Sequence, residues 1–254
     1  MHIAVIRRVS SAITRCELTH ITRQEIDHAR ACAQHLQYEN ALRGLGVDVV
    51  VLEAEPDLPD SVFVEDAAVV LDEIAILTRP GAATRRPEVG SIASALAPYR
   101  GLAAIQAPDT LDGGDVLVVG RTIHVGLSSR STAGAIEQLR VIAGPEGYDV
   151  HELNVADCLH LKSAVTQVGD SILLINPLWV SRDAFPGMEF IEVDPTEPQA
   201  ANAVLVGETI VYPSSFPATR ARLEKAGVAV VTVDADELAK AEGAVTCCSL
   251  LFQA

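Results

Sequence analysis

Two adjacent cysteines near the C-terminus, Cys247 and Cys248, are the residues from which a covalent mechanism could start. They lie in the uncharged apolar run 243–252, which predicts a buried strand. Successive side chains of a strand point to opposite faces, so the two thiols cannot serve the same site. Either one of them faces a functional site or both belong to the core, because free cysteine is among the most buried residue types.

A cysteine nucleophile needs a base or a cation that lowers its pKa, and a histidine oriented by a carboxylate provides proton transfer and orientation. Cys247, His160 and Asp112 could form such a set, although no local signature connects them. Each also has an ordinary explanation. His160 lies between two leucines and could be a half-buried structural residue, and Asp112 could be a turn residue. Gly113 and Gly114 would allow a close backbone approach beside Asp112.

Two adjacent carboxylates, Glu65 and Asp66, are embedded in the apolar run 62–70. An unpaired charge in such surroundings is costly, so both need a cation. The sequence leaves two sources open: an arginine of the protein, Arg79 or Arg85, or a cationic substrate. A guanidinium ligand would bind a carboxylate through two parallel hydrogen bonds.

A repeated pattern of strands and helices must position these residues. Four β-rich pairs turn at residues 72, 120, 169 and 207, each through two residues that contain Gly or Asp, which predicts four hairpins. A period of roughly 40 to 50 residues indicates a repeat architecture. Between and before the turns the pattern predicts helices over 24–45, 86–96, 132–142 and 217–226, and further strands over 47–52, 148–153, 189–193 and 228–233.

The first strand, 3–6, can pair with the last, 244–252, and so supply a fifth unit that closes a ring and removes its exposed edges. We therefore predict one α/β domain over 1–254, built as a ring of five ββαβ units. An open α/β sheet is the alternative, but the hairpins argue against it because parallel strands need long crossovers. Reactive residues recur at the inner ends of several units: Asp60, Glu65 and Asp66, then Asp112 and Asp115, then His160, and finally Cys247.

Composition narrows the class of protein. Of the 254 residues, 49% are hydrophobic and 21% are charged, which excludes a disordered chain. No apolar run reaches the roughly 18 residues that a membrane span needs. Five cysteines without CxxC spacing favour a reducing cytoplasm and no metal cluster, and the N-terminus lacks a secretion signal. Phosphate-binding glycine loops are absent. A net charge of −15 disfavours nucleic acid and anionic membranes and is compatible with a cationic substrate.

Taken together, these motifs resemble those of the dimethylarginine dimethylaminohydrolases, members of the guanidine-modifying or pentein superfamily. The matches run in order from about residue 60 to the end, and the first sixty residues are similar only loosely. The resemblance implies a five-bladed αβ propeller, which agrees with the repeat count. The matching segments are 63–66, 78–82 with 85–86, 111–115, 125–128 with Arg130, 160–163, 200–202 and 246–249.

The resemblance also implies roles for individual residues. Cys247 would attack the guanidinium carbon, His160 would protonate the departing amine and then activate water, and Asp112 would orient His160. The residues implied in substrate binding are Glu65 and Asp66 for the guanidinium, Arg85 and Arg130 for the α-carboxylate, Asp60 for the amino-acid end, Leu18 for a backbone contact from a lid loop, and Ala241 for a carbonyl near the site.

By the same resemblance the substrate is a methylated L-arginine, the product is citrulline, and neither a metal nor another cofactor is needed. Zinc could bind Cys247 and His160 as an inhibitor, since both are good ligands. A homodimer is compatible with the family, although the sequence does not determine the oligomeric state. Two other functions stay open: deimination of arginine or agmatine, or amidino transfer, and a pentein module that binds ligands without turnover.

Overall fold

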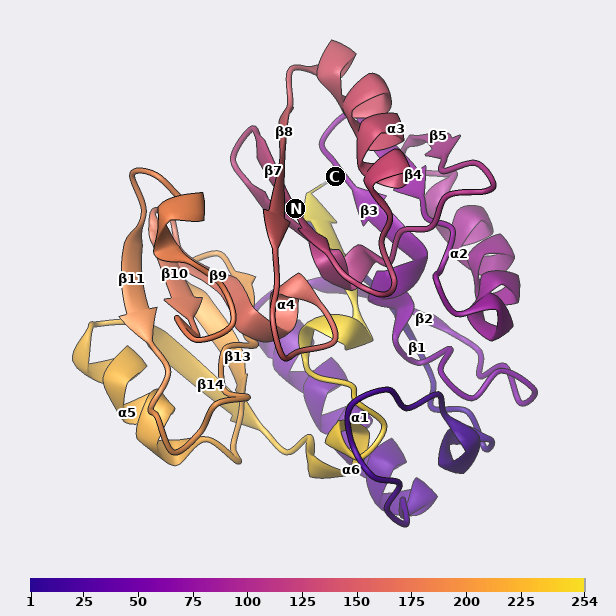
Figure 1. Ribbon diagram of the computed structural model, residues 1–254. Helices are drawn as coiled ribbons and strands as arrows, with labels where there is room; N and C mark the ends of the chain where they lie inside the picture. Colours follow the sequence, from indigo (N-terminus) through magenta and orange to yellow (C-terminus); the bar gives the residue numbers. More distant parts are fainter. Residues whose placement is uncertain (254) are drawn as a thin grey trace.

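Figure 1 shows the computed structural model, which describes residues 1–253 as a ring of five small sheets. Each sheet has three strands: an antiparallel hairpin whose second strand also pairs in parallel with a third. The predicted α/β propeller is therefore confirmed, and the open sheet is not formed. The strands of blades two to five are β3 (Ala68–Val70), β4 (Ile74–Leu77), β5 (Gly101–Ala104), β6 (Val116–Val119), β7 (Thr122–Leu127), β8 (Asp149–Asn154), β9 (Val165–Gly169), β10 (Ile172–Ile175), β11 (Glu189–Glu192), β12 (Val204–Val206), β13 (Thr209–Pro213) and β14 (Ala229–Val233).

The first blade is assembled from both ends of the chain. Strand β1 (His2–Arg7) pairs with β15 (Leu250–Gln253), as predicted, and this pairing is antiparallel. On its other side β1 pairs in parallel with β2 (Asp48–Leu52). The two termini consequently lie close together in Figure 1. Because the two ends of the chain pair with each other, the first blade is complete and the ring is closed.

Helices α2 (Val89–Leu96), α3 (Ala133–Ala143) and α5 (Pro217–Lys225) lie on the outside of the ring (Figure 1). Helix α1 (His28–Gly44) starts later than predicted because Asp27 caps it, accepting a hydrogen bond from the Arg30 backbone N–H at 3.0 Å. Helix α2 is also shorter, since Ala83–Glu88 forms a 3-10 segment before it. Two short helices complete the set: α4 (Leu161–Ala164) and α6 (Asp236–Ala239).

The predicted strand 243–252 is wrong in its first half. Thr246–Cys248 forms one turn of 3-10 helix, and only Leu250–Gln253 is strand. Periodicity cannot distinguish an apolar turn from a buried strand, and here a side chain of another blade accepts the N–H of Thr246. The two thiols still differ, because Cys248 is fully buried in an apolar cluster while Cys247 is partly exposed.

Short helical turns precede the first strand in four of the five blades, and they pack against one another near the centre of the ring. Their hydrogen-bonding groups and side chains therefore meet, although they come from distant parts of the sequence. These turns are Val64–Ala67 before β3, Gly113–Asp115 before β6, Leu161–Ala164 before β9 and Thr246–Cys248 before β15.

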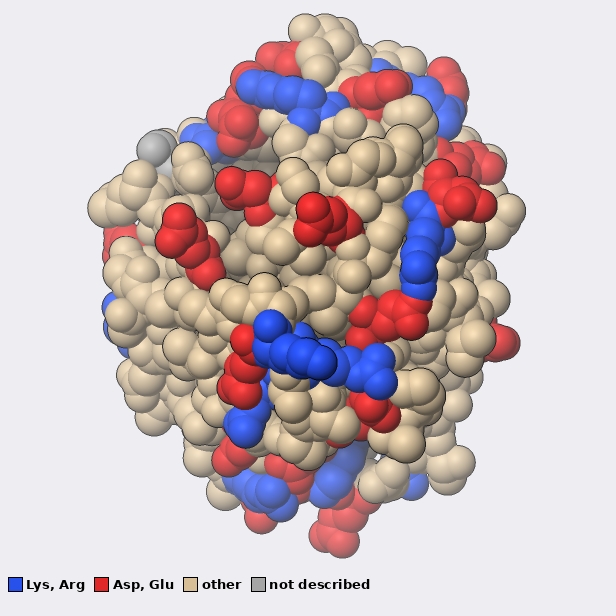
Figure 2. All heavy atoms as spheres, turned by 90° about the vertical axis from the view of Figure 1, so that its left-hand side faces the viewer, with Lys and Arg blue, Asp and Glu red and all other residues tan. Residues whose placement is uncertain are grey.

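On the face that carries β11 and α5, basic side chains lie beside acidic ones, as Figure 2 shows. Arg222, for example, pairs with Asp194 at 2.8 Å. Among the described helices, none combines the length and the apolar character that crossing a membrane requires.

Candidate active site

One pocket brings together seven of the ten residues that the sequence predicts for the site. Its lining includes Cys247, His160, Asp66, Asp60, Arg85, Arg130 and Ala241. Three predicted residues lie just outside it: Asp112 behind His160, Glu65 on the far side of the central turns, and Leu18 in the loop above. The pocket also contains five residues that the sequence analysis did not select: Glu17, Phe63, Leu159, Glu242 and Gly243.

His160 immediately precedes α4, and two carboxylates flank its buried ring. Its Nε2 lies 3.1 Å from Asp112 Oδ2, and its Nδ1 lies 3.9 Å from Asp66 Oδ1. Burial by itself disfavours the imidazolium, but Asp66, the hydrogen bond to Asp112, and Asp115 outweigh it and raise the pKa of His160 to about 9. The imidazole is thus protonated near neutral pH and can act as an acid.

The backbone beside His160 has room only for glycine. A Cβ atom built on Gly114 would lie 2.5 Å from His160 Nδ1, and one on Gly113 would lie 2.0 Å from the carbonyl oxygen of Glu65. The predicted close approach at these two glycines is therefore confirmed. It lets the turn that follows Asp112 pack directly on the turn that carries Glu65.

Asp112 is held in place by its own partners. Its Oδ1 accepts a hydrogen bond from the Gly81 N–H at 2.8 Å, and its N–H donates to Ser131 Oγ at 3.1 Å. Asp115, which the sequence placed at the inner end of the same unit, accepts a bond from the N–H of Leu161 at 3.0 Å. Both carboxylates thus restrain the segment that carries His160.

The two adjacent carboxylates have different cations. Asp66 pairs with Arg85, which also pairs with Glu88 at 2.9 Å. Burial would raise the pKa of Asp66, but His160 and Arg85 lower it to about 2, so it stays ionised. Of the two arginines proposed as internal partners, Arg79 is wrong: it donates to the backbone carbonyls of Pro108 and Asp109.

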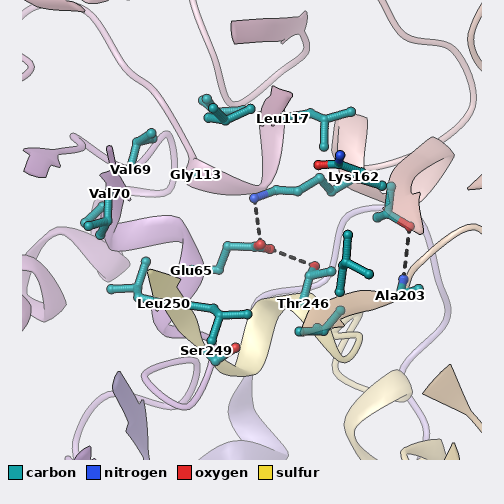
Figure 3. Close-up of a pocket in the computed structure, with 18 residues that line it drawn as sticks. Glu65, Val69, Val70, Gly113, Leu117, Lys162, Ala203, Thr246, Ser249 and Leu250 are labelled. Atoms are coloured by element: carbon teal, nitrogen blue, oxygen red, sulfur yellow. Dashed lines mark hydrogen bonds and ion pairs between the residues drawn. The ribbon is translucent and has the colours of Figure 1, made fainter. Parts of the chain in front are cut away.

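Glu65 points to the other side of the central turns, where it pairs with Lys162 at 2.6 Å. Its second oxygen accepts a hydrogen bond from Thr246 Oγ1 at 2.9 Å. Figure 3 shows Glu65 between these two partners, beside a cavity of about 300 Å³. Glu65 and Lys162 line this cavity, whereas Cys247 and His160 line the smaller pocket described above.

Cys247 is a thiol rather than a thiolate in this environment. Burial and the nearby carboxylates of Glu65 and Asp66 hold its pKa well above the ordinary value. A cation placed next to the sulfur would act in the opposite direction and favour the thiolate. Cys248 donates to the Ala244 carbonyl at 3.4 Å inside the core.

A loop of residues 16–23, the lid loop, covers the pocket. The Glu242 carboxylate accepts backbone hydrogen bonds from Thr19 at 2.8 Å, from Ile21 at 2.7 Å, and from His20 between them. Asp60 accepts the N–H of Glu17 at 3.1 Å. The pocket below has a volume of about 20 Å³, the room that one water molecule needs. An amino-acid ligand can therefore enter only after the lid loop moves.

A metal ion would find oxygen and nitrogen ligands here. Within residues 1–253, the ligand atoms of Asp66, Asp112 and His160 lie within 4.8 Å of one another. Both carboxylates already have partners, Asp112 in His160 and Asp66 in Arg85, so a metal ion would have to displace these interactions. Zinc at Cys247 and His160 stays a prediction.

Comparisons with known proteins identify similar chains. A family model described as N,N dimethylarginine dimethylhydrolase, eukaryotic, matches residues 10–184. The N(G),N(G)-dimethylarginine dimethylaminohydrolase of Streptomyces coelicolor is 39% identical over 249 residues, 97% of this chain and 95% of that protein.

Two solved structures are also similar. One is a cysteine-to-serine mutant of dimethylarginine dimethylaminohydrolase from Pseudomonas aeruginosa complexed with citrulline, with a TM-score of 0.94, 32% identity and 98% of both chains covered. The other is a histidine-to-glycine variant of a dimethylarginine dimethylaminohydrolase as an adduct with S-methyl-L-thiocitrulline. It also has a TM-score of 0.94 and 32% identity, and the match covers 98% of this chain and 99% of that chain.

The protonated state of His160 should make the protein more stable at low pH. Because its pKa of about 9 exceeds the unfolded value of 6.5, its contribution is complete below pH 6.5 and is lost as the pH rises through 9. We expect the free energy of unfolding, measured by urea denaturation, to fall by up to roughly 3 kcal/mol over this range. His160→Gln should remove this part of the slope of unfolding free energy against pH. The parts due to Glu88, whose pKa is raised to about 7, and to the thiols, whose pKa values are also raised, should remain. Equal slopes in the two proteins would contradict the assignment.

Glu242→Gln should loosen the lid loop, because it removes a charged acceptor of three backbone N–H groups. A hydrogen bond to a charged group contributes about 1.5–3 kcal/mol, so alkylation of Cys247 by iodoacetamide should accelerate by about tenfold or more. The control is Glu197→Gln, since Glu197 likewise accepts the N–H groups of Ala218 and Thr219 but lies outside the pocket. Alkylation at the same rate in both variants would show that Glu242 does not hold the loop.

Proposed function

The chain belongs to the dimethylarginine dimethylaminohydrolase family, and we propose that it hydrolyses Nω-methylated L-arginine. Asymmetric dimethylarginine and monomethylarginine would give L-citrulline with dimethylamine or methylamine. One observation carries the proposal: a cysteine and a protonated histidine line the same pocket beside buried carboxylates suited to a guanidinium. The citrulline complex of the Pseudomonas aeruginosa relative supports the substrate class.

The carboxylates supply the recognition of the guanidinium. Asp66 lines the pocket in its ionised form, so it can accept hydrogen bonds from the substrate as well as from Arg85. Glu65, which does not line the pocket, would assist in binding the guanidinium through its negative charge. Asp60, Leu18 and Ala241 would complete the site once the lid loop closes on the amino-acid end of the substrate.

Of the two arginines assigned to the α-carboxylate, Arg130 is the more available. Arg85 already donates to Asp66, Glu88 and the carbonyl of Phe63. Arg130 lies 4.0 Å from Asp112 and makes one bond to the lid loop, from Nη2 to Thr19 Oγ1 at 2.8 Å. Binding of a carboxylate at Arg130 would therefore also engage the lid loop.

The reaction would begin when the cationic substrate favours loss of the Cys247 proton to solvent. The thiolate attacks the guanidinium carbon and forms a C–S bond. His160, protonated at rest, gives its proton to the departing dimethylamine as the C–N bond breaks, which leaves an S-alkylthiouronium. Neutral His160 then takes a proton from water, whose oxygen attacks the same carbon. The C–S bond then breaks as the hydroxyl proton of the tetrahedral intermediate passes to the sulfur. Citrulline leaves, and the Cys247 thiol is regenerated.

The two thiols provide the decisive test. Incubation with asymmetric dimethylarginine, monomethylarginine, arginine and agmatine should give ureido product from the methylated arginines. We expect Cys247→Ser to lower this rate by about a thousandfold or more, because it removes the nucleophile. Cys248→Ser should retain most of the rate, since Cys248 lies in the core.

Other outcomes of the same assay have defined meanings. Product from arginine or agmatine alone would indicate a deiminase, and no product from any substrate would indicate a binding module. Equal loss in both folded cysteine variants would refute Cys247 as the nucleophile. We further propose that zinc inhibits by binding Cys247 and His160. Added zinc should then lower the rate, and a chelator should restore it.

Arg130→Ala should raise KM for α-carboxylate substrates by about a hundredfold, because a charged partner is left without its counterpart. Steady-state measurement of citrulline formation checks this. Arg79→Ala is the matched control, since Arg79 belongs to a loop after a hairpin but donates only to backbone carbonyls. An unchanged KM in the Arg130 variant would refute its role in carboxylate binding.

A further inference from the structure

Asn202 occupies in the fifth blade the place that reactive residues occupy in the other blades. It lies just before β12, the first strand of that blade, and its side chain is only 4% exposed. It does not line the pocket that contains Cys247 and His160. Its side chain nevertheless contacts two of the central turns, those that contain Lys162 and Thr246.

The side-chain amide of Asn202 joins two segments of the site. Its Nδ2 donates to the Lys162 carbonyl at 3.0 Å and to Thr246 Oγ1 at 2.9 Å. Its Oδ1 accepts the backbone N–H of Thr246 at 3.0 Å. Because one partner is a carbonyl and another is an N–H, the orientation of the amide is determined.

These bonds close a cycle across the ring. Thr246 Oγ1 donates to Glu65, and Glu65 pairs with Lys162, as Figure 3 shows. The backbone carbonyl of Lys162 accepts the hydrogen bond from Asn202 Nδ2, which completes the cycle. The cycle thus connects four blades through three buried side chains and the half-buried Lys162. Hydrogen bonds between buried groups are strong, and an unpaired group there is costly.

We propose that Asn202 is a positioning residue that sets the distance between the Cys247 thiol and the His160 imidazole. Thr246 directly precedes Cys247, and Lys162 lies two residues after His160. Both hydrogen-bond partners of Asn202 are therefore close in the chain to the residues that react. A single turn of 3-10 helix is weak by itself and needs such an external restraint. The inference rests on the proposed function, in which this thiol and this imidazole react together.

Asn202→Asp tests the role without a change of size, because it places a carboxylate oxygen against the Lys162 carbonyl. We expect kcat to fall by about 10- to 100-fold with KM changed by less than about twofold, since misplacement of about 1 Å has effects of this size. The pH profile of Cys247 alkylation by iodoacetamide should shift as well. This second measurement needs no substrate.

Asn176 provides the matched controls: Asn176→Asp for Asn202→Asp, and Asn176→Ala for Asn202→Ala, a pair in which no charge is added. Asn176 is 2% exposed, donates to the Pro198 carbonyl at 2.9 Å and accepts the N–H of Leu178 at 3.0 Å, away from the pocket. We expect both Asn176 variants to keep the wild-type alkylation profile. If the Asn202 variants have wild-type kcat and alkylation profile, or change both no more than the corresponding Asn176 variants do, the positioning role is wrong.

Thr246 provides a second test that does not depend on the folding of the Asn202 variants. Thr246→Ser keeps the hydroxyl and should retain kcat, whereas Thr246→Val removes it at equal size and should lower kcat by about tenfold. The double variant Asn202→Ala/Thr246→Val should be no slower than the worse single variant. Additive losses, or a Val variant as fast as the Ser variant, would overturn the inference. Failure of the proposed function would appear differently, as a wild-type protein without ureido product.

Discussion

The buried charges around Asp66 are the constraint on which the rest of the site depends. Asp66, Arg85 and His160 are each at least nine-tenths buried, and any of these charges would be costly there without a partner. Together they stay ionised, because Arg85 and His160 lower the pKa of Asp66 while Asp66 raises that of His160. The molecule thus keeps a protonated imidazole in a pocket that has room for about one water molecule.

The same carboxylates that hold His160 protonated keep Cys247 protonated. A negative environment favours an imidazolium and disfavours a thiolate, so the pair does not form the ion pair that activates many cysteine enzymes. A guanidinium changes this balance, because it adds positive charge where the carboxylates dominate. Activation of the thiol would then follow substrate binding, and an unoccupied site would react slowly with other electrophiles.

The ring supplies the geometry that this chemistry needs. Short turns before the first strands of four blades meet at the centre, and the fifth blade adds Asn202. Each reacting group is therefore attached to a different sheet, and the sheets are fixed to one another by the closure of β1 on β15. Above them the lid loop is held by Glu242 and Asp60 through its backbone N–H groups, and by Arg130 through the hydroxyl of Thr19.

The sequence by itself determined the ring of five units, because hairpin turns and strand periodicity are local and appear in the order of the chain. It also indicated Cys247, His160 and the carboxylates, since their residue types restrict the chemistry. Only the tertiary structure decided which cation neutralises which carboxylate and that Cys247 lies on a turn rather than a strand. It also decided that Lys162 and Asn202 contact the central turns and that Glu242 binds the lid loop. These features depend on contacts between residues up to 223 positions apart, and no local pattern encodes such contacts.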